Sequence, residues 1–140
     1  MKTIIPLKVI SIQEQGYHFI LKIKINSKVA HMVLDTGASQ TVLDKNRIQR
    51  FITDQEFEKS NALSTGLGTN SMESHIAYVS KMKLGDLTIK NAFVILLDLS
   101  IVNSSYEQIG EKPIDGIIGS DILMNYKAVI DFGKKLLMLK

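Results

Sequence analysis

The alternation of apolar and polar positions predicts that the chain folds mainly into short β-strands. From Tyr17 to Ile25 apolar residues alternate with polar ones, which is typical of a strand with one face in the core and the other in water. The segment Val29 to Leu34 is nearly all apolar. We expect it to be the hairpin partner of the first segment, covered on both faces, with Asn26-Ser27 as the turn.

The same kind of pattern continues on both sides of this hairpin. Residues 72–84 and 87–97 flank Gly85-Asp86, a tight-turn signal, and predict a second hairpin. Shorter strands are expected in MKTIIPLKVISIQ at the start of the chain, at 41–43, in PIDGIIG up to Gly119, and on both sides of Gly133-Lys134 in AVIDFGKKLLMLK.

Helical signals are few and short. Asp44 is placed to cap a brief helix to about Ile52, in which Ile48, Phe51 and Ile52 share a face. Ser120 is placed to cap a second helix, from Asp121 to about Tyr126. Residues 53–64, the stretch STGLGTNS at 64–71 and residues 99–112 are expected to be links or loops. Taken together, the many short strands and few helices predict an all-β, barrel-like domain with one or two short helices.

Composition bounds the class of protein. With 140 residues, 45% of them hydrophobic and 22% charged, the chain is expected to form a single globular domain over 1–140. The net charge is +3, but the basic residues are scattered along the sequence, so no nucleic-acid partner is expected. No stretch resembles a signal peptide or a membrane span, which favours a cytoplasmic protein without a membrane partner.

The residue types also restrict the chemistry. The chain has no cysteine, which excludes disulfides, thiolate metal sites and cysteine nucleophiles. Its three histidines, His18, His31 and His75, lie in strand patterns, and none has an acidic neighbour at helical metal-site spacing. We therefore expect no metal and no cofactor.

The segment HMVLDTGASQTVL, at 31–43, places an acidic residue directly after an apolar strand. Asp-Thr-Gly at such a point is often only a turn, in which the Asp side chain accepts backbone N–H groups and Gly supplies a positive φ. The alternative is functional. Burying the carboxylate of Asp35 behind a core strand is unfavourable unless a partner compensates, and activation of a water molecule would supply a reason for it.

Water activation at this position requires a second carboxylate. Two carboxylates in hydrogen-bonding reach share one proton, so the ionised one can deprotonate water while the protonated one polarises a carbonyl. Only Asp35 has the Asp-Thr-Gly or Asp-Ser-Gly context in this chain, which therefore holds half of such a site. A twofold dimer would bring two copies of Asp35 together.

Three segments, in this order, resemble the retropepsin-like aspartic proteases, the family of the dimeric retroviral enzymes and their bacterial single-domain relatives. LDTGAS at 34–39 is similar to the catalytic loop, TGLGTNSM at 65–72 resembles the flap, and IIGSDIL at 117–123 resembles the segment that leads into the family's helix. The terminal AVIDF and LLML strands lie where the family places strands near its dimer interface. The resemblance implies a retropepsin-like closed barrel and a homodimeric aspartic endopeptidase that acts on peptides or proteins.

The resemblance also implies roles for individual residues. Asp35 would be the catalytic carboxylate, and the Thr36 hydroxyl would tie its loop to the partner's loop. Around them the family pattern places Gly37 for close backbone approach, Ala38 beside the substrate path, Ser39 as a hydrogen-bond donor to Asp35, Gly66, Leu67 and Gly68 in the substrate-binding flap, and Gly119 under the active-site loop with Ile117 and Ile118 in the core.

This chain departs from the retroviral pattern by the predicted helix after Asp44, the longer link at 53–64 and a flap with fewer glycines. These departures leave substrate preference and flap motion open. An alternative from another functional class stays open with them. In that alternative the chain is a retropepsin-fold dimerisation or peptide-binding module that keeps Asp35 but has no peptidase activity.

Overall fold

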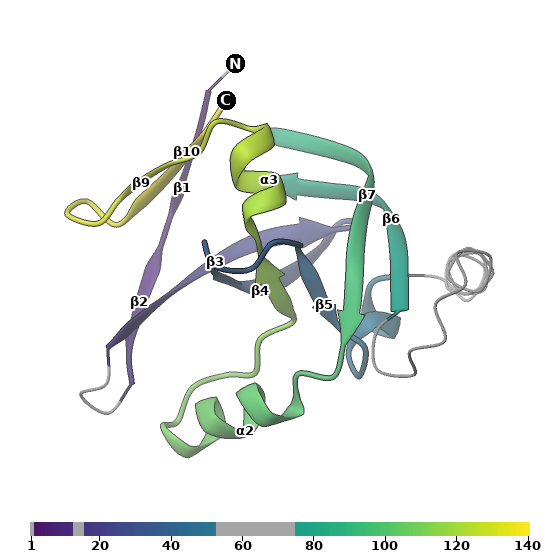
Figure 1. Ribbon diagram of the computed structural model, residues 1–140, viewed down its shortest axis with the longest axis vertical. Helices are drawn as coiled ribbons and strands as arrows, with labels where there is room; N and C mark the ends of the chain where they lie inside the picture. Colours follow the sequence, from purple (N-terminus) through teal and green to yellow (C-terminus); the bar gives the residue numbers. More distant parts are fainter. Residues whose placement is uncertain (1, 13–15, 53–74) are drawn as a thin grey trace.

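The computed structural model describes residues 2–12, 16–52 and 75–140, which form a closed six-stranded barrel and a small separate sheet (Figure 1). Around the barrel the strands follow the order β3 (Tyr17–Ile25), β4 (Lys28–Leu34), β8 (Gly116–Ile118), β5 (Val42–Asp44), β7 (Leu87–Leu97) and β6 (His75–Leu84). Pairing of β6 with β3 closes the ring, and β2 (Lys8–Ser11) extends it beside β3. The prediction of a closed, retropepsin-like barrel is confirmed.

The small sheet joins the two ends of the chain. In it β1 (Thr3–Pro6), β10 (Leu136–Leu139) and β9 (Val129–Asp131) pair in this order, all antiparallel. Thr3 lies opposite Leu139, so the termini lie close together, as Figure 1 shows. The start of the chain is thus two strands, β1 and β2, where one was predicted. β9 lies at an edge of the sheet and has no strand on its second side within the described chain.

The core fills the barrel because strand alternation directs one set of side chains inward. In β3 the side chains of Leu21, Ile23 and Ile25 are buried, and in β6 those of Met82 and Leu84 are buried. The predicted shared face of Ile48, Phe51 and Ile52 is also buried in this core. The hairpin around Gly85-Asp86 is confirmed over its described part, β6 and β7. In β4, however, Val29 is 45% exposed, so this strand is not covered on both faces along its whole length.

The helical elements differ from the expectation. The helix predicted after Asp44 is a single 3-10 turn, η1 (Ile48–Arg50), because Asp44 still belongs to β5. The predicted link at 99–112 contains a helix, α2 (Ser100–Gln108). In α3 (Ser120–Asn125), Ser120 is the first helical residue and not the cap. None of the helices in the described ranges is long and apolar enough to cross a membrane.

Candidate active site

Asp35 lies directly after the end of β4, which pairs with β8, and its side chain is exposed. β4 ends at Leu34, and the backbone N–H of Asp35 still donates to the carbonyl of Ile118 in β8, at 3.0 Å. The chain then turns, so that the N–H of Gly37 donates to Asp35 Oδ1 at 2.9 Å and that of Ala38 to the Asp35 carbonyl at 3.2 Å. In this single chain the Asp35 side chain is exposed, and the expectation that the chain itself buries it is wrong.

The segment after β8, Gly119 and Ser120, packs against the backbone of the loop that contains Asp35. The N–H of Ser120 donates to the Ala38 carbonyl at 2.7 Å. A Cβ on Gly119 would lie 2.7 Å from the backbone of Gln40 and 2.9 Å from the Ala38 oxygen, closer than real Cβ contacts allow. Only glycine fits at this point, and Gly119 packs closely against the backbone of the loop. Ile118 is fully buried, while Ile117 is partly exposed.

Thr41 and Asp121 join the loop to α3 by side-chain hydrogen bonds. The hydroxyl of Thr41, which is fully buried, donates to Asp121 Oδ1 at 2.8 Å, and its N–H donates to Oδ2 at 3.1 Å. The same hydroxyl accepts the N–H of Gly119 at 3.1 Å. The loop is therefore held at both ends by groups whose hydrogen bonds are satisfied, a rigid arrangement suited to positioning a reactive group.

The remaining predicted site residues are placed as follows. Thr36 and Ser39 are exposed, and Ala38 is half-buried. The donor that reaches the Asp35 carboxylate is the Gly37 amide, where the Ser39 hydroxyl was expected. Gly66, Leu67 and Gly68 lie outside the described residues.

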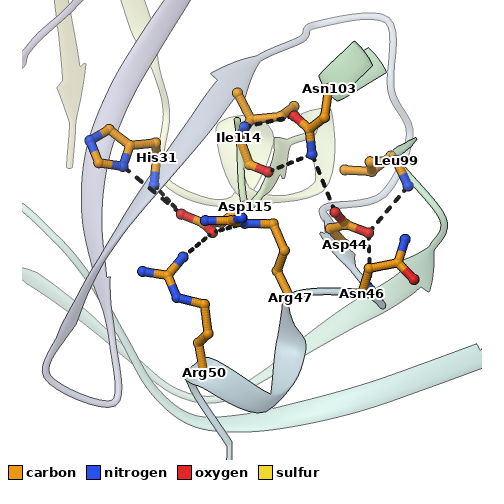
Figure 2. A network of polar contacts seen from close by, with 9 residues as sticks. All are labelled: His31, Asp44, Asn46, Arg47, Arg50, Leu99, Asn103, Ile114 and Asp115. Atoms are coloured by element: carbon orange, nitrogen blue, oxygen red, sulfur yellow. Dashed lines mark hydrogen bonds and ion pairs between the residues drawn. The ribbon is translucent and has the colours of Figure 1, made fainter. Parts of the chain in front are cut away.

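A second carboxylate, Asp115, lies at the other end of the β4–β8 pair and is 1% exposed (Figure 2). It accepts from Arg47 Nε at 2.7 Å, Arg50 Nη1 at 2.8 Å and the backbone N–H of His31 at 2.8 Å. Burial lowers the pKa of His31 from its ordinary value of 6.5, against the opposing effect of Asp115. A buried carboxylate needs such partners to be tolerated.

A third carboxylate, that of Asp44, anchors α2. Asp44 is 2% exposed and accepts from the N–H of Leu99 at 3.2 Å and from Asn103 Nδ2 at 3.3 Å. Asn103 also exchanges two hydrogen bonds with the backbone of Ile114, at 2.8 and 3.1 Å (Figure 2). These contacts fix α2 against the strand that leads to Gly119.

α2 also reaches toward the active-site end of the barrel. Tyr106, which is buried, shares a 2.6 Å hydrogen bond between its hydroxyl and His18 Nδ1. Burial, with a smaller contribution from Glu111, raises the pKa of Tyr106 to about 12. The Tyr106 hydroxyl therefore stays protonated at any pH at which the protein would act.

A cavity of about 560 Å³ opens beside Asp35 and Thr36, between the barrel and the small sheet. Most of its walls are apolar. The lining side chains come from three regions: Val9 and Tyr17 to Phe19 in the first strands, Val33 to Thr36 at the end of β4, and Ile130, Phe132 and Lys135 around β9. Within the described ranges, no group of three or more His, Asp or Glu side chains is arranged to hold a metal ion.

Sequence reasoning missed the supporting carboxylates. Asp44 is predicted to cap a helix, and neither Asp115 nor Asp121 has the Asp-Thr-Gly context that marks Asp35. A sequence signal existed for Asp121, since it lies in the first turn of a predicted helix, where carboxylates accept free backbone donors. For Asp115 no such signal existed, because its cationic partners lie 65 and 68 residues away.

Comparison with known proteins agrees with this geometry. Residues 21–122 match the family described as aspartyl protease. Among solved structures, the chain is similar to a retropepsin-like aspartic protease from Rickettsia conorii, with 21% identity and a TM-score of 0.60 over 99% of this chain and 90% of that chain. It is similar also to the retroviral protease-like domain of Ddi1 from Leishmania major, with 16% identity and a TM-score of 0.59 over 86% of each chain. No curated protein matches the chain.

Proposed function

Because the chain belongs to the aspartyl protease family, we propose that it is an endopeptidase whose active site pairs two Asp35 carboxylates, one from each subunit of a homodimer. The observation that carries this proposal is the state of Asp35. It is the carboxylate that the fold places on a rigid, hydrogen-bonded loop and yet leaves exposed beside an apolar cavity.

Three other carboxylates of the described chain, two of them buried and that of Asp121 partly buried, are engaged elsewhere. Asp44, Asp115 and Asp121 accept hydrogen bonds from groups far away in the sequence, and each holds two elements together. None of them is available as a partner for Asp35. The second acid is therefore assigned to a second copy of the chain, which also supplies the environment in which one proton is shared.

The edge of the small sheet supports an interface on this side of the molecule. In the described part of the chain β9 has a free edge. The apolar residues Val129 and Phe132, which are 53% and 73% exposed, lie in β9 or directly after it. Phe132 and Ile130 line the same cavity as Thr36. A free strand edge with exposed apolar groups favours pairing with another chain. A second copy that pairs here would cover the cavity and bring the two Asp35 loops together.

The chemistry then follows from the pair. The ionised carboxylate takes a proton from a water molecule held between the two acids, and the water oxygen attacks the peptide carbonyl carbon. The protonated carboxylate donates its proton toward the carbonyl oxygen. The substrate is proposed to be an extended peptide, because an added strand offers its backbone to hydrogen bonds and its alternate side chains to pockets.

The experiment is peptide-library cleavage between mildly acidic and neutral pH, with and without a peptide-mimetic aspartic protease inhibitor. We expect inhibitor-sensitive cleavage that falls by roughly 10²–10⁴-fold in Asp35→Asn, since an essential acid–base group is lost. Asp86→Asn is the matched control, because Asp86 is exposed in a turn on another part of the barrel. Lack of cleavage by the wild type at every pH would support the inactive module instead.

The dimer is tested separately by sedimentation of Phe132→Asp. A charge at this edge is expected to weaken self-association and cleavage together while the chain stays folded. Ile101→Asp is the matched control, because Ile101 is 83% exposed on α2, away from β9. Equal effects of both variants would contradict an interface at β9.

A further inference from the structure

Five lysines that are scattered along the sequence gather on the outer wall of the barrel. Strand register places Lys24 opposite Lys83 and Lys81 opposite Lys90. Lys22 lies two residues before Lys24 on β3, opposite His31 on β4. We call this set the lysine face: Lys22, Lys24, Lys81, Lys83 and Lys90.

Alternation along the strands directs all five of these side chains outward. Their neighbours Ile23, Ile25, Met82 and Leu84 are buried in the core, with at most 3% exposure. Directly opposite residues share a face of the sheet, and so do residues two apart on one strand. All five lysines are exposed, as this geometry requires.

The charge of the lysine face is not compensated by the strands that carry it. β3, β4, β6 and β7 contain no Asp or Glu, and the acid nearest to them in β6–β7 is Asp86, in the turn. In the described part of the chain none of the five lysines forms an ion pair. Like charges directly opposite each other destabilise a sheet. Two such pairs therefore favour contact with anionic groups.

The form of the face favours an acidic polypeptide over a nucleic acid. Its five cations are all lysines, without the arginine forks that bind phosphates with two parallel hydrogen bonds. They are about 6.6–7 Å apart along a strand and about 4.8 Å apart across strands, and the first spacing is that of alternate side chains in an extended peptide. Within the described residues, this part of the outer wall consists of strands and contains no helix that could enter a groove.

We propose that the lysine face is a docking surface for an acidic segment of the protein substrate, an inference that rests on the proposed peptidase function. β4 connects the face to the active site, because His31 lies beside Lys22 and Asp35 follows four residues later, at about 13 Å. A substrate whose scissile bond lies at Asp35 would reach the lysines with acidic residues several positions away from that bond.

Binding is tested on Asp35→Asn, which keeps the full chain but does not consume the probe. The probe is a fluorescent peptide of alternating Glu and Ser, measured by anisotropy at low and moderate salt. Lys24→Gln/Lys81→Gln/Lys83→Gln is expected to weaken binding roughly tenfold, and the loss should shrink as salt rises. The matched control is Lys2→Gln/Lys45→Gln/Lys140→Gln, which removes the same charge from exposed sites elsewhere and should leave binding unchanged.

Three results would overturn the docking surface: no salt-sensitive binding, equal weakening in both triple variants, or tighter binding of a single-stranded oligonucleotide or of phosphatidylserine vesicles than of the peptide. In the active chain, a cleavable peptide with a Glu-rich extension should show a higher KM in the lysine-face variant, with kcat unchanged. If the wild type cleaves nothing, the proposed function fails, while the anisotropy result still decides whether the face binds acidic peptides.

Discussion

Asp115 and Asp35 lie at the two ends of the same parallel strand pair, β4 and β8, and the fold treats them in opposite ways. Asp115 is 1% exposed and accepts from two guanidinium groups and a backbone amide. Asp35 is exposed, and among the described residues its carboxylate accepts only from the Gly37 amide, two residues away. The carboxylate of Asp115 is occupied by structural hydrogen bonds and ion pairs. The carboxylate of Asp35 is held in position but can still accept hydrogen bonds from water or substrate.

This difference separates stability from chemistry. Removing a carboxylate with buried partners leaves donors and cations unpaired, whereas removing an exposed one leaves little unsatisfied. A carboxylate used in catalysis must keep free acceptor positions for water and substrate. The partners of each acid, rather than its residue type or its place beside a strand, therefore indicate its role.

The largest effect on stability is expected from Asp115→Ala. It should lower the free energy of unfolding by about 2–4 kcal/mol, less than for a fully buried pair because Arg47 and Arg50 are 28% and 51% exposed. Asp35→Asn should stay within about 0.5 kcal/mol of the wild type. Urea unfolding measures both changes, with Asp86→Ala as the control for an exposed acid. Equal destabilisation by the Asp115 and Asp35 variants would contradict the claim that Asp115 stabilises the fold and Asp35 does not.

Gly119→Ala tests how the Asp35 end of the strand pair is held in position. The added methyl would overlap the Gln40 backbone, so the loop or α3 must shift, and we expect a loss of about 1–3 kcal/mol. Because the shift moves the Asp35 loop, cleavage should fall more than stability alone explains. Gly133→Ala is the matched control, since its Cβ would make only an ordinary contact at 3.5 Å. Thermal unfolding and kcat/KM distinguish the two variants, and equal effects would contradict a role of Gly119 in positioning the loop.

The smallest expected effect is on the pH dependence of stability, through His31 beside Asp115. The pKa of His31 is lowered in the folded chain, so the unfolded chain binds more protons as the pH falls through about 6.5. This contribution to stability is present above that pH and is lost below it. His31→Gln should therefore make the decline of stability between pH 7 and pH 5 slightly less steep, as measured by urea unfolding at each pH. His75→Gln is the control, and an unchanged slope in the His31 variant would contradict the assignment.

The strands could be predicted from sequence because alternation and turn residues are local signals. The hairpin around Gly85-Asp86 agrees with the structure. The helix α2 could not be predicted in this way, because its segment is rich in serine and weakly apolar. Its stability comes from burial of Tyr106 and from the contacts of Asn103 with Asp44 and Ile114, which are tertiary.

Only part of the candidate site could be predicted, because sequence patterns report local structure and not tertiary contacts. The Asp-Thr-Gly segment is local and identified the loop, but the exposure of Asp35 depends on where the closed barrel ends. The partners of Asp115 and the pairing of Lys24 with Lys83 depend on strand register across more than fifty residues. Patterns of single residues along the chain do not contain that information.

The most direct test of the central claim is the cleavage rate of mixed dimers. Wild type and Asp35→Asn are unfolded together, refolded at several ratios and assayed at constant total protein. If each active site needs one Asp35 from each subunit, activity follows the square of the wild-type fraction, about a quarter at equal parts. A linear fall, to about a half at equal parts, would show that each subunit acts alone and would contradict the paired site.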